Sequence, residues 1–201
     1  MFLPRARSTL AAFALLALGA CGDDDHPLKP GESGLTQQQT MAVFNSFMDV
    51  NNQVLSGSAT GRAAPGGISA AMSPLPFELT GPCPLGGMLS FQGVFTEDVD
   101  DNGTGTSIFD LTETPNGCKA SSTLGQVTFD GDPNLQVSYA MDWKEYTPTL
   151  FRWTMKGALR FSGAAVGSCT ADLSYTLDYG TRKYTMTGIM CGHQLRFSGG
   201  G

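Results

Sequence analysis

The sequence predicts an all-β domain, an antiparallel meander of about eight strands, preceded by one amphipathic helix. Three observations predict this fold class. From residue 77 onward, apolar and polar side chains alternate, which is typical of antiparallel strands with one buried and one solvated face. Short segments rich in Gly, Pro, Asp and Asn separate the alternating stretches. Four cysteines lie symmetrically about two of those segments. A small up-and-down barrel and a strongly curled sheet or sandwich are both compatible with such a meander.

The first 20 residues have the organisation of an export signal. Arg5 and Arg7 precede an apolar stretch at residues 10–18, which is too short to span a bilayer as a helix. Small residues then lead directly into Cys21. This order, with LGAC at residues 18–21, resembles the type II signal peptide and lipobox of bacterial lipoproteins. An ordinary secretory signal peptide followed by an incidental cysteine is the alternative.

The lipoprotein resemblance implies that residues 1–20 are removed and that Cys21 carries acyl chains such as palmitate. Several acyl chains anchor a protein stably to a membrane of the cell envelope, whereas a single chain binds only marginally. Gly22 rather than Asp follows the cysteine. By the same resemblance this implies the outer membrane, at its periplasmic leaflet or at the cell surface. The later β region carries no motif of a characterised family.

The segments that follow predict a tether, a helix and a linker. Residues 21–34 are Gly, Pro and charge, with no apolar face to bury, and they predict a flexible tether. In residues 35–55, Thr36 and Gln39 match a capping box, and the pattern favours a helix packed on the domain. The apolar stripe consists of Met41, Phe44, Phe47, Met48, Val54 and Leu55. Small residues, Gly and Pro at 56–76 predict a linker before the β domain at 77–201.

The alternation places the strands at 88–96, 106–114, 126–130, 135–143, 151–161, 171–179, 184–191 and 194–198. Cross-strand neighbours must point to the same face of a sheet, so apolar residues should pair with apolar residues. Turns at 98–103, 131–134, 145–148 and 163–168 satisfy this rule by pairing Phe91 with Phe109, Phe129 with Leu135, Met141 with Trp153, and Leu159 with Leu173, respectively. A sequential meander is therefore expected.

Four cysteines remain after the lipidation cysteine is set aside, and an even set in an exported protein predicts two disulfides. Several connectivities are possible, but the positions favour one of them. Cys83 and Cys118 are symmetric about the turn-like segment 98–103, and Cys169 and Cys191 are symmetric about a glycine-containing turn. We expect each pair to close the base of its own hairpin. Metal binding by these cysteines is disfavoured because the chain has no C-x-x-C motif.

The chain offers little recognisable chemistry. Ser-His-Asp catalysis would depend on His193 alone, no G-x-S-x-G motif is present, and no free thiol is expected, so the sequence does not predict an enzyme. Asp98, Asp100 and Asn102, followed by Gly103, resemble the first half of an EF-hand calcium loop. Position twelve of that pattern is Phe109 rather than Glu, so an Asx-rich hairpin turn is the favoured interpretation and calcium the weaker one. No other cofactor or metal is expected.

Charge and hydropathy exclude some partners. The net charge is −6, and removal of the basic signal would make the mature chain more acidic still, which disfavours nucleic acid as a partner. After the signal, no apolar run is long enough for a transmembrane helix, so membrane attachment is expected through the lipid anchor.

Two function classes remain open. The first is a structural or protein-interaction role for an envelope lipoprotein that contacts another envelope protein. The second is binding or carriage of a small, lipid-like apolar ligand inside a barrel, lined by Phe91, Phe109, Tyr139, Trp143, Trp153 and Tyr175. An apolar cavity above a few hundred Å3 favours the second class, and a filled core favours the first.

Overall fold

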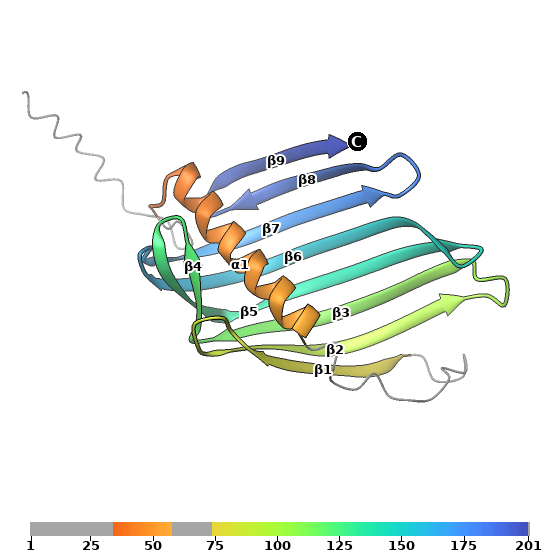
Figure 1. Cartoon of the computed structure of the whole chain (residues 1–201), viewed down its shortest axis with the longest axis horizontal. Coiled ribbons are helices and arrows are strands. Elements are labelled where there is room, and N and C mark those ends of the chain that lie inside the picture. Colours follow the sequence, from red (N-terminus) through yellow and green to blue (C-terminus); the bar gives the residue numbers. More distant parts are fainter. Residues whose placement is uncertain (1–33, 58–73, 201) are drawn as a thin grey trace, which may run out of the picture.

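The computed structural model describes residues 34–57 and 74–200, which form one helix and nine strands (Figure 1). The helix is α1 (Gln37–Gly57). The strands are β1 (Leu75–Pro82), β2 (Met88–Val99), β3 (Gly105–Asn116), β4 (Cys118–Ser122), β5 (Gly125–Lys144), β6 (Thr147–Gly163), β7 (Gly167–Asp178), β8 (Lys183–Met190) and β9 (His193–Gly200). The all-β, antiparallel meander predicted from the alternation is therefore confirmed.

All strands belong to one antiparallel sheet with the order β1-β2-β3-β5-β6-β7-β8-β9, and the short β4 pairs with β5 beside this path. The edge strands β1 and β9 do not pair with each other, so the sheet is open. The expectation of a small closed barrel is wrong for this reason. The strands left at the two edges keep unpaired backbone groups.

Helix α1 crosses one face of this sheet, which we call the inner face (Figure 1). Its 21 residues give a length of about 32 Å, and the eight strands of the path span about 34 Å. Close to the start of the helix, His193 Nε2 on β9 lies 2.6 Å from the carbonyl oxygen of Leu35. Near the other end, the helix contacts β1. The helix therefore bridges the two edges of the sheet.

The predicted capping box starts the helix. The backbone N–H of Thr36 donates to Gln39 Oε1 at 2.9 Å, and the N–H of Gln39 donates to Thr36 Oγ1 at 3.2 Å. Reciprocal bonds of this kind satisfy N–H groups that have no partner inside the helix. The helix begins at Gln37 and ends at Gly57, so both of its ends lie two residues later in the chain than predicted.

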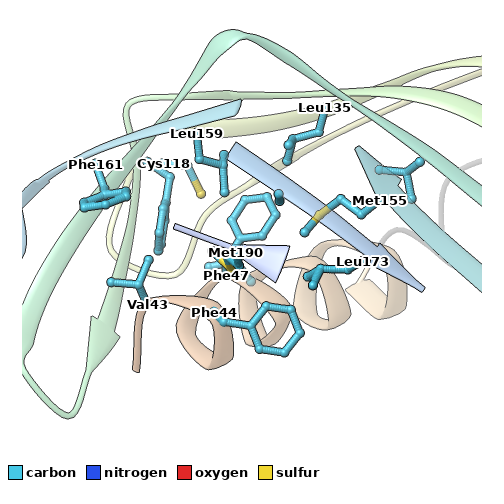
Figure 2. Packing of buried hydrophobic residues seen from close by; sticks show 14 of the residues in the cluster. Val43, Phe44, Phe47, Cys118, Leu135, Met155, Leu159, Phe161, Leu173 and Met190 are labelled. Atoms are coloured by element: carbon cyan, nitrogen blue, oxygen red, sulfur yellow. The ribbon is translucent and has the colours of Figure 1, made fainter. Parts of the chain in front are cut away.

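The core lies between the helix and the inner face (Figure 2). Phe47 has no exposed surface, and its ring meets that of Phe129 edge-on with centroids 5.3 Å apart. Ser46 Oγ donates to the carbonyl oxygen of Ser121, which joins the helix to β4 at 3.0 Å. Around this contact the strands contribute Cys118, Leu135, Met155, Leu159, Phe161, Leu173 and Met190. These contacts fix where the helix covers the sheet.

Both disulfides expected from the sequence are present. Cys83 is joined to Cys118 with Cα atoms 5.4 Å apart, and Cys169 is joined to Cys191 with Cα atoms 4.5 Å apart. The first links the β1–β2 connection to the start of β4, and the second links β7 to the turn before β9. Each lies just outside a ladder of paired strands, as the symmetry of the cysteines predicted.

One predicted hairpin is wrong. The strands expected at 126–130 and 135–143 are halves of the single strand β5, and the segment between them is an irregularity in the register rather than a turn. Phe129 consequently pairs with Phe161 on β6, and not with Leu135. The Gly, Pro and Asn residues of this segment suit a bulge as well as a turn, so composition alone did not separate the two.

Three other predicted pairings are displaced along the strands. Phe109 pairs with Phe95 instead of Phe91, Met141 pairs with Phe151 instead of Trp153, and Leu159 pairs with Cys169 instead of Leu173. Each displacement is an even number of residues, so the same side chains still face inward. The inner face was thus identified correctly although these registers were not.

Two strands were not expected. Strand β1 begins at Leu75, inside the predicted linker 56–76, and it contains Pro76 and Pro82. Proline is tolerated there because β1 is an edge strand. Strand β4 is only five residues long, and its residues are small or polar. Most of the predicted linker, the tether and the signal lie outside the described residues.

Candidate ligand-binding cavity

A cavity of about 470 Å3 lies beside the last turn of α1, over the inner face of β1, β2, β3, β5 and β6. It is lined by Leu55, Phe77, Phe95, Glu97, Ser107, Phe109, Leu111, Tyr139, Ala140, Met141, Trp143 and Phe151. Most of these side chains are aliphatic or aromatic. A volume of this size is within the range of small-molecule sites in proteins, and a well-packed interior has few voids larger than a water molecule.

The strand register builds the floor of the cavity. Leu75, Phe95, Phe109, Tyr139, Trp153, Tyr175, Met186 and Phe197 are cross-strand partners in succession, one from each strand of the path. We call this set the aromatic row. Directly opposite side chains in antiparallel strands lie about 5 Å apart, so the row is a continuous apolar band perpendicular to the strands. Three of its members line the cavity.

Aromatic contacts hold the cavity walls in place. The rings of Phe95 and Phe109 lie 4.5 Å apart, and Phe77 meets Phe109 edge-on at 5.3 Å. On the other side, Tyr139 and Phe151 are 6.4 Å apart. Leu55 is the only helical side chain in the lining, because α1 ends at Gly57. The cavity therefore forms where the helix stops covering the aromatic rings.

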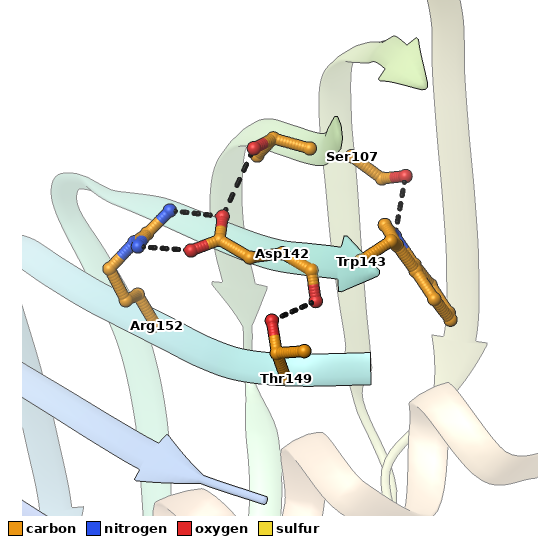
Figure 3. A network of polar contacts seen from close by, with 6 residues as sticks. Ser107, Asp142, Trp143, Thr149 and Arg152 are labelled. Atoms are coloured by element: carbon orange, nitrogen blue, oxygen red, sulfur yellow. Dashed lines mark hydrogen bonds and ion pairs between the residues drawn. The ribbon is translucent and has the colours of Figure 1, made fainter. Parts of the chain in front are cut away.

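A short polar chain occupies one end of the cavity, and Figure 3 shows its hydrogen bond between Trp143 and Ser107. Trp143 Nε1 donates to Ser107 Oγ at 3.0 Å, and Ser107 Oγ donates to Glu97 Oε1 at 3.4 Å. The Glu97 side chain is exposed, and Ser107 is buried. These groups satisfy one another, so they leave the remaining lining apolar.

A second set of polar side chains, centred on Asp142, connects the strands on the opposite face of the sheet. Arg152 makes a bidentate ion pair with Asp142, with Nη1 donating to Oδ2 at 2.7 Å and Nη2 donating to Oδ1 at 2.6 Å. Thr106 Oγ1 donates to Asp142 Oδ1 at 3.0 Å, and Thr149 Oγ1 donates to the backbone oxygen of Asp142 at 3.1 Å (Figure 3). The contacts join β3, β5 and β6 behind the cavity, and bidentate pairing fixes their geometry.

The calcium candidates Asp98, Asp100 and Asn102 lie at the hairpin that connects β2 to β3. Asp100 Oδ1 accepts hydrogen bonds from the backbone N–H groups of Asn102 at 3.0 Å and Thr104 at 2.8 Å. Asp98 pairs with Thr106 inside the ladder. The described part of the chain contains no group of three or more His, Cys, Asp or Glu side chains placed to hold a metal ion. The carboxylate of Asp100 acts here as the cap of an Asx-type turn.

Two ionisable groups in or near the cavity, on Glu113 and Tyr139, have raised pKa values. Glu113 on β3 is 1% exposed, and burial raises the pKa of its carboxyl group to about 8, although a hydrogen bond from Asn51 opposes the shift. Its Oε1 has no hydrogen-bond partner in the described structure. Burial, followed by the charge of Glu113, raises the pKa of the Tyr139 phenol, and the nearby Trp153 N–H partly offsets this. That N–H makes no hydrogen bond of acceptable geometry.

The residues named from the sequence divide between the cavity and its surroundings. Phe109, Tyr139 and Trp143 line the cavity, whereas Phe91 is buried in the core. Trp153 and Tyr175 belong to the aromatic row outside the lining. The sequence reasoning did not identify Leu55, Phe77, Phe95, Glu97 or Ser107 as lining residues. Phe95 shares the parity of Phe91, and this signal places it on the inner face.

Comparisons of the chain with protein-family models, with curated proteins and with solved structures found no match. Within residues 34–57 and 74–200, no helix is long and apolar enough to cross a membrane. The candidate site is therefore interpreted from its own geometry.

Proposed function

We propose that this chain is a lipid-anchored protein of the cell envelope whose β domain binds an apolar small molecule in the cavity beside α1. The observation that carries the ligand-binding part is the cavity of about 470 Å3 with its mainly aliphatic and aromatic lining. An apolar cavity above a few hundred Å3 is the feature that favours ligand carriage over a structural role with a filled core. The site is a groove between an open sheet and a helix, in place of the barrel interior expected from the sequence.

The polarity of the lining indicates the chemistry of the ligand. Among the residues that the structure describes, none in the lining is basic, and Glu97 is the only acidic one. An anionic group inside the cavity would therefore lack a partner, and burying an unpaired charge is costly. A hydrocarbon body needs no hydrogen bonds and is favoured by the area that it removes from water. The supported ligand class is thus an apolar molecule or the apolar part of an amphiphile.

Binding is tested with the neutral fluorescent probe N-phenyl-1-naphthylamine. Met141 lines the cavity, and Met141→Trp fills part of its volume. We expect the wild-type chain to bind the probe and Met141→Trp to weaken binding by about tenfold or more. Met88→Trp is the matched control, because Met88 is 42% exposed and lies outside the lining. Absence of probe binding to the wild-type chain, or equal binding by both variants, would contradict the proposal.

The lipid anchor is tested separately. Cys21 lies outside the described residues, and its proposed modification is supported by the resemblance of LGAC to a lipobox. Metabolic labelling with an alkyne analogue of palmitate should mark the wild-type chain, and Cys21→Ser should abolish the label and release the protein from the membrane fraction. Retention of label by Cys21→Ser would refute lipidation at this residue.

A protein-interaction role is the second candidate, and the open edge of β9 favours it. This strand has no neighbour on one side, contains no proline, and carries Arg196 as its only permanently charged residue. Such an edge can accept a strand from a partner. Crosslinking in native envelopes would support this role if residues of β9 were joined to another envelope protein, and would disfavour it if crosslinks avoided β9.

A further inference from the structure

The apolar floor of the cavity does not end at the cavity. The aromatic row continues from Tyr139 onto β6, β7, β8 and β9 through Trp153, Tyr175, Met186 and Phe197. Beside it, a parallel set of cross-strand partners runs from the cavity residues Met141 and Phe151 through Leu177 to Tyr184. Two adjacent apolar bands therefore leave the cavity in the same direction.

Ring contacts connect these bands into a ladder. Phe151 lines the cavity, and its ring centroid lies 6.1 Å from that of Tyr175 on β7. Tyr175 stacks on Tyr184 of β8, again at 6.1 Å. With the contact between Tyr139 and Phe151, four rings on four neighbouring strands form a series of nearly equal steps. The ladder runs across the strands and begins inside the cavity.

The exposure of the ladder increases away from the cavity. Tyr139, Phe151 and Tyr175 are half-buried, whereas Tyr184 is 40% exposed and Phe197 in the neighbouring band is 37% exposed. The helix starts beside His193 on β9, far along the strands from these rings, and it reaches the cavity only with its last turn. Within residues 34–57 and 74–200, nothing covers the apolar inner face over β7 and β8 at this level.

We propose that the ligand carries a single long acyl chain, which extends from the cavity across β6, β7 and β8 and contacts Tyr175 and Tyr184. This inference rests on the proposed function and specifies its ligand. Because the described lining contains no basic residue, the hydrocarbon end lies in the cavity and the polar head beyond it. The chain lies perpendicular to the strands, along the ring ladder.

Other elongated ligands fit this surface less well. A sugar chain or a peptide carries polar groups along its whole length, and each needs a hydrogen bond to replace its lost water. Between Phe151 and Tyr184 the two bands offer apolar side chains, with the tyrosine hydroxyls as their polar groups. A polymethylene chain has no such requirement. Each methylene that is fully buried strengthens binding about fourfold, so affinity should depend on chain length.

The experiment uses the full chain held in an amphipol and measures displacement of N-phenyl-1-naphthylamine. The competitors are saturated fatty acids of eight and sixteen carbons and a lysophosphatidylcholine with a sixteen-carbon chain. The test variant is Tyr184→Ala. Tyr179→Ala is its control, because Tyr179 is also 40% exposed but lies in the β7–β8 turn outside the two bands. Thermal unfolding of both variants shows whether their folds are intact.

We expect the sixteen-carbon acid to bind the wild-type chain at least about tenfold more tightly than the eight-carbon acid. Tyr184→Ala should weaken the long acid about fivefold and leave the short acid unchanged, while Tyr179→Ala changes neither. If the lysophospholipid displaces the probe as well as the sixteen-carbon acid does, the bound acyl chain can belong to lipids generally. If the lysophospholipid fails to compete, the bound acyl chain is that of a free fatty acid. The inference is overturned if affinity is independent of chain length, or if Tyr184→Ala affects both acids alike. Failure of the probe itself to bind would instead refute the proposed function.

Discussion

The carboxyl group of Glu113 on β3 and the side-chain amide of Asn51 on α1 meet inside the core, at the boundary between the sheet and the helix. Both residues are buried: Glu113 is 1% exposed and Asn51 is 3% exposed. The Oε1 atom of Glu113 has no hydrogen-bond partner in the described structure. Glu113 has Phe91 and Leu135 as its cross-strand neighbours. A neutral carboxylic acid suits such a position better than a carboxylate does.

The first prediction concerns pH. Burial raises the pKa of Glu113 from 4.5 to about 8, so the folded state holds a proton that the unfolded state releases between these values. The contribution of Glu113 to the free energy of unfolding is therefore largest below about pH 4.5, falls as the pH rises towards 8, and levels off above it, by an amount on the order of a few kcal/mol. Glu113→Gln should remove this decline, which urea unfolding at several pH values would measure.

The control for this experiment is Asp110→Asn, because Asp110 lies on the exposed face of the same strand. The decline in stability with pH should persist in that variant. A decline of unchanged size in Glu113→Gln would show that Glu113 is not its source.

The second prediction concerns the contact between helix and sheet. Phe47 is fully buried against Phe129, so Phe47→Ala should lower the free energy of unfolding by about 3–5 kcal/mol through lost burial and the cavity left behind. Met48→Ala is the comparison, since the neighbouring Met48 is only partly buried and should cost less than half as much. Equal losses in chemical denaturation would indicate that the helix does not pack as described.

The third prediction concerns a glycine that allows close approach of two strands. A Cβ atom on Gly93 would overlap the backbone carbonyl of Asp110 on β3. Gly93→Ala should therefore destabilise the fold by about 2–3 kcal/mol, as other overpacking substitutions do. Gly57→Ala is the control, because a Cβ at this helix end meets nothing within 4 Å. Thermal unfolding that ranked the two variants in the opposite order would be incompatible with this register of β2 and β3.

The fourth prediction concerns the disulfides. Cys83–Cys118 spans 35 residues and Cys169–Cys191 spans 22, and cross-links of these lengths constrain the unfolded chain by about 3–4 kcal/mol each. Replacing either pair by Ala should lower stability by amounts of this order, and reducing agent should destabilise the wild-type chain and leave a chain with both pairs replaced unaffected. If reduction left the wild-type midpoint in urea unchanged, the bonds would contribute nothing to stability.

The amino-acid pattern was sufficient to predict which side chains face inward but not which residues lie opposite one another. The alternation of Phe91, Phe109, Met141 and Leu159 with polar residues defines a face, and any even displacement of the register preserves that face. The true register depends on turn geometry, such as the bend that couples Tyr146 to the neighbouring turn. There, the Tyr146 hydroxyl donates to the backbone oxygen of Asp101 at 2.7 Å. A contact between two turns so far apart in sequence leaves no local signal.

The cavity was unpredictable for a related reason. Its lining combines Leu55 of the helix with Phe77 of an unexpected edge strand and with Phe95, whose partner Phe109 was predicted to pair with another residue. The position of α1 depends on β4, since Ser46 bonds to Ser121, and β4 has too few apolar residues to be recognised as a strand. By contrast, the capping box at Thr36 and the cysteine pairs were predictable because each depends on nearby or symmetric positions.

Helix α1 is about as long as the sheet is wide; Leu35, just before its start, contacts β9, and the helix itself contacts β1. Its presence on the inner face keeps β1 and β9 apart, because the edges could meet only through the space that the helix occupies. The flank of the fold therefore stays open along its length. The proposed ligand would enter or leave sideways while every strand keeps its neighbours, so its exchange would need no rupture of backbone hydrogen bonds.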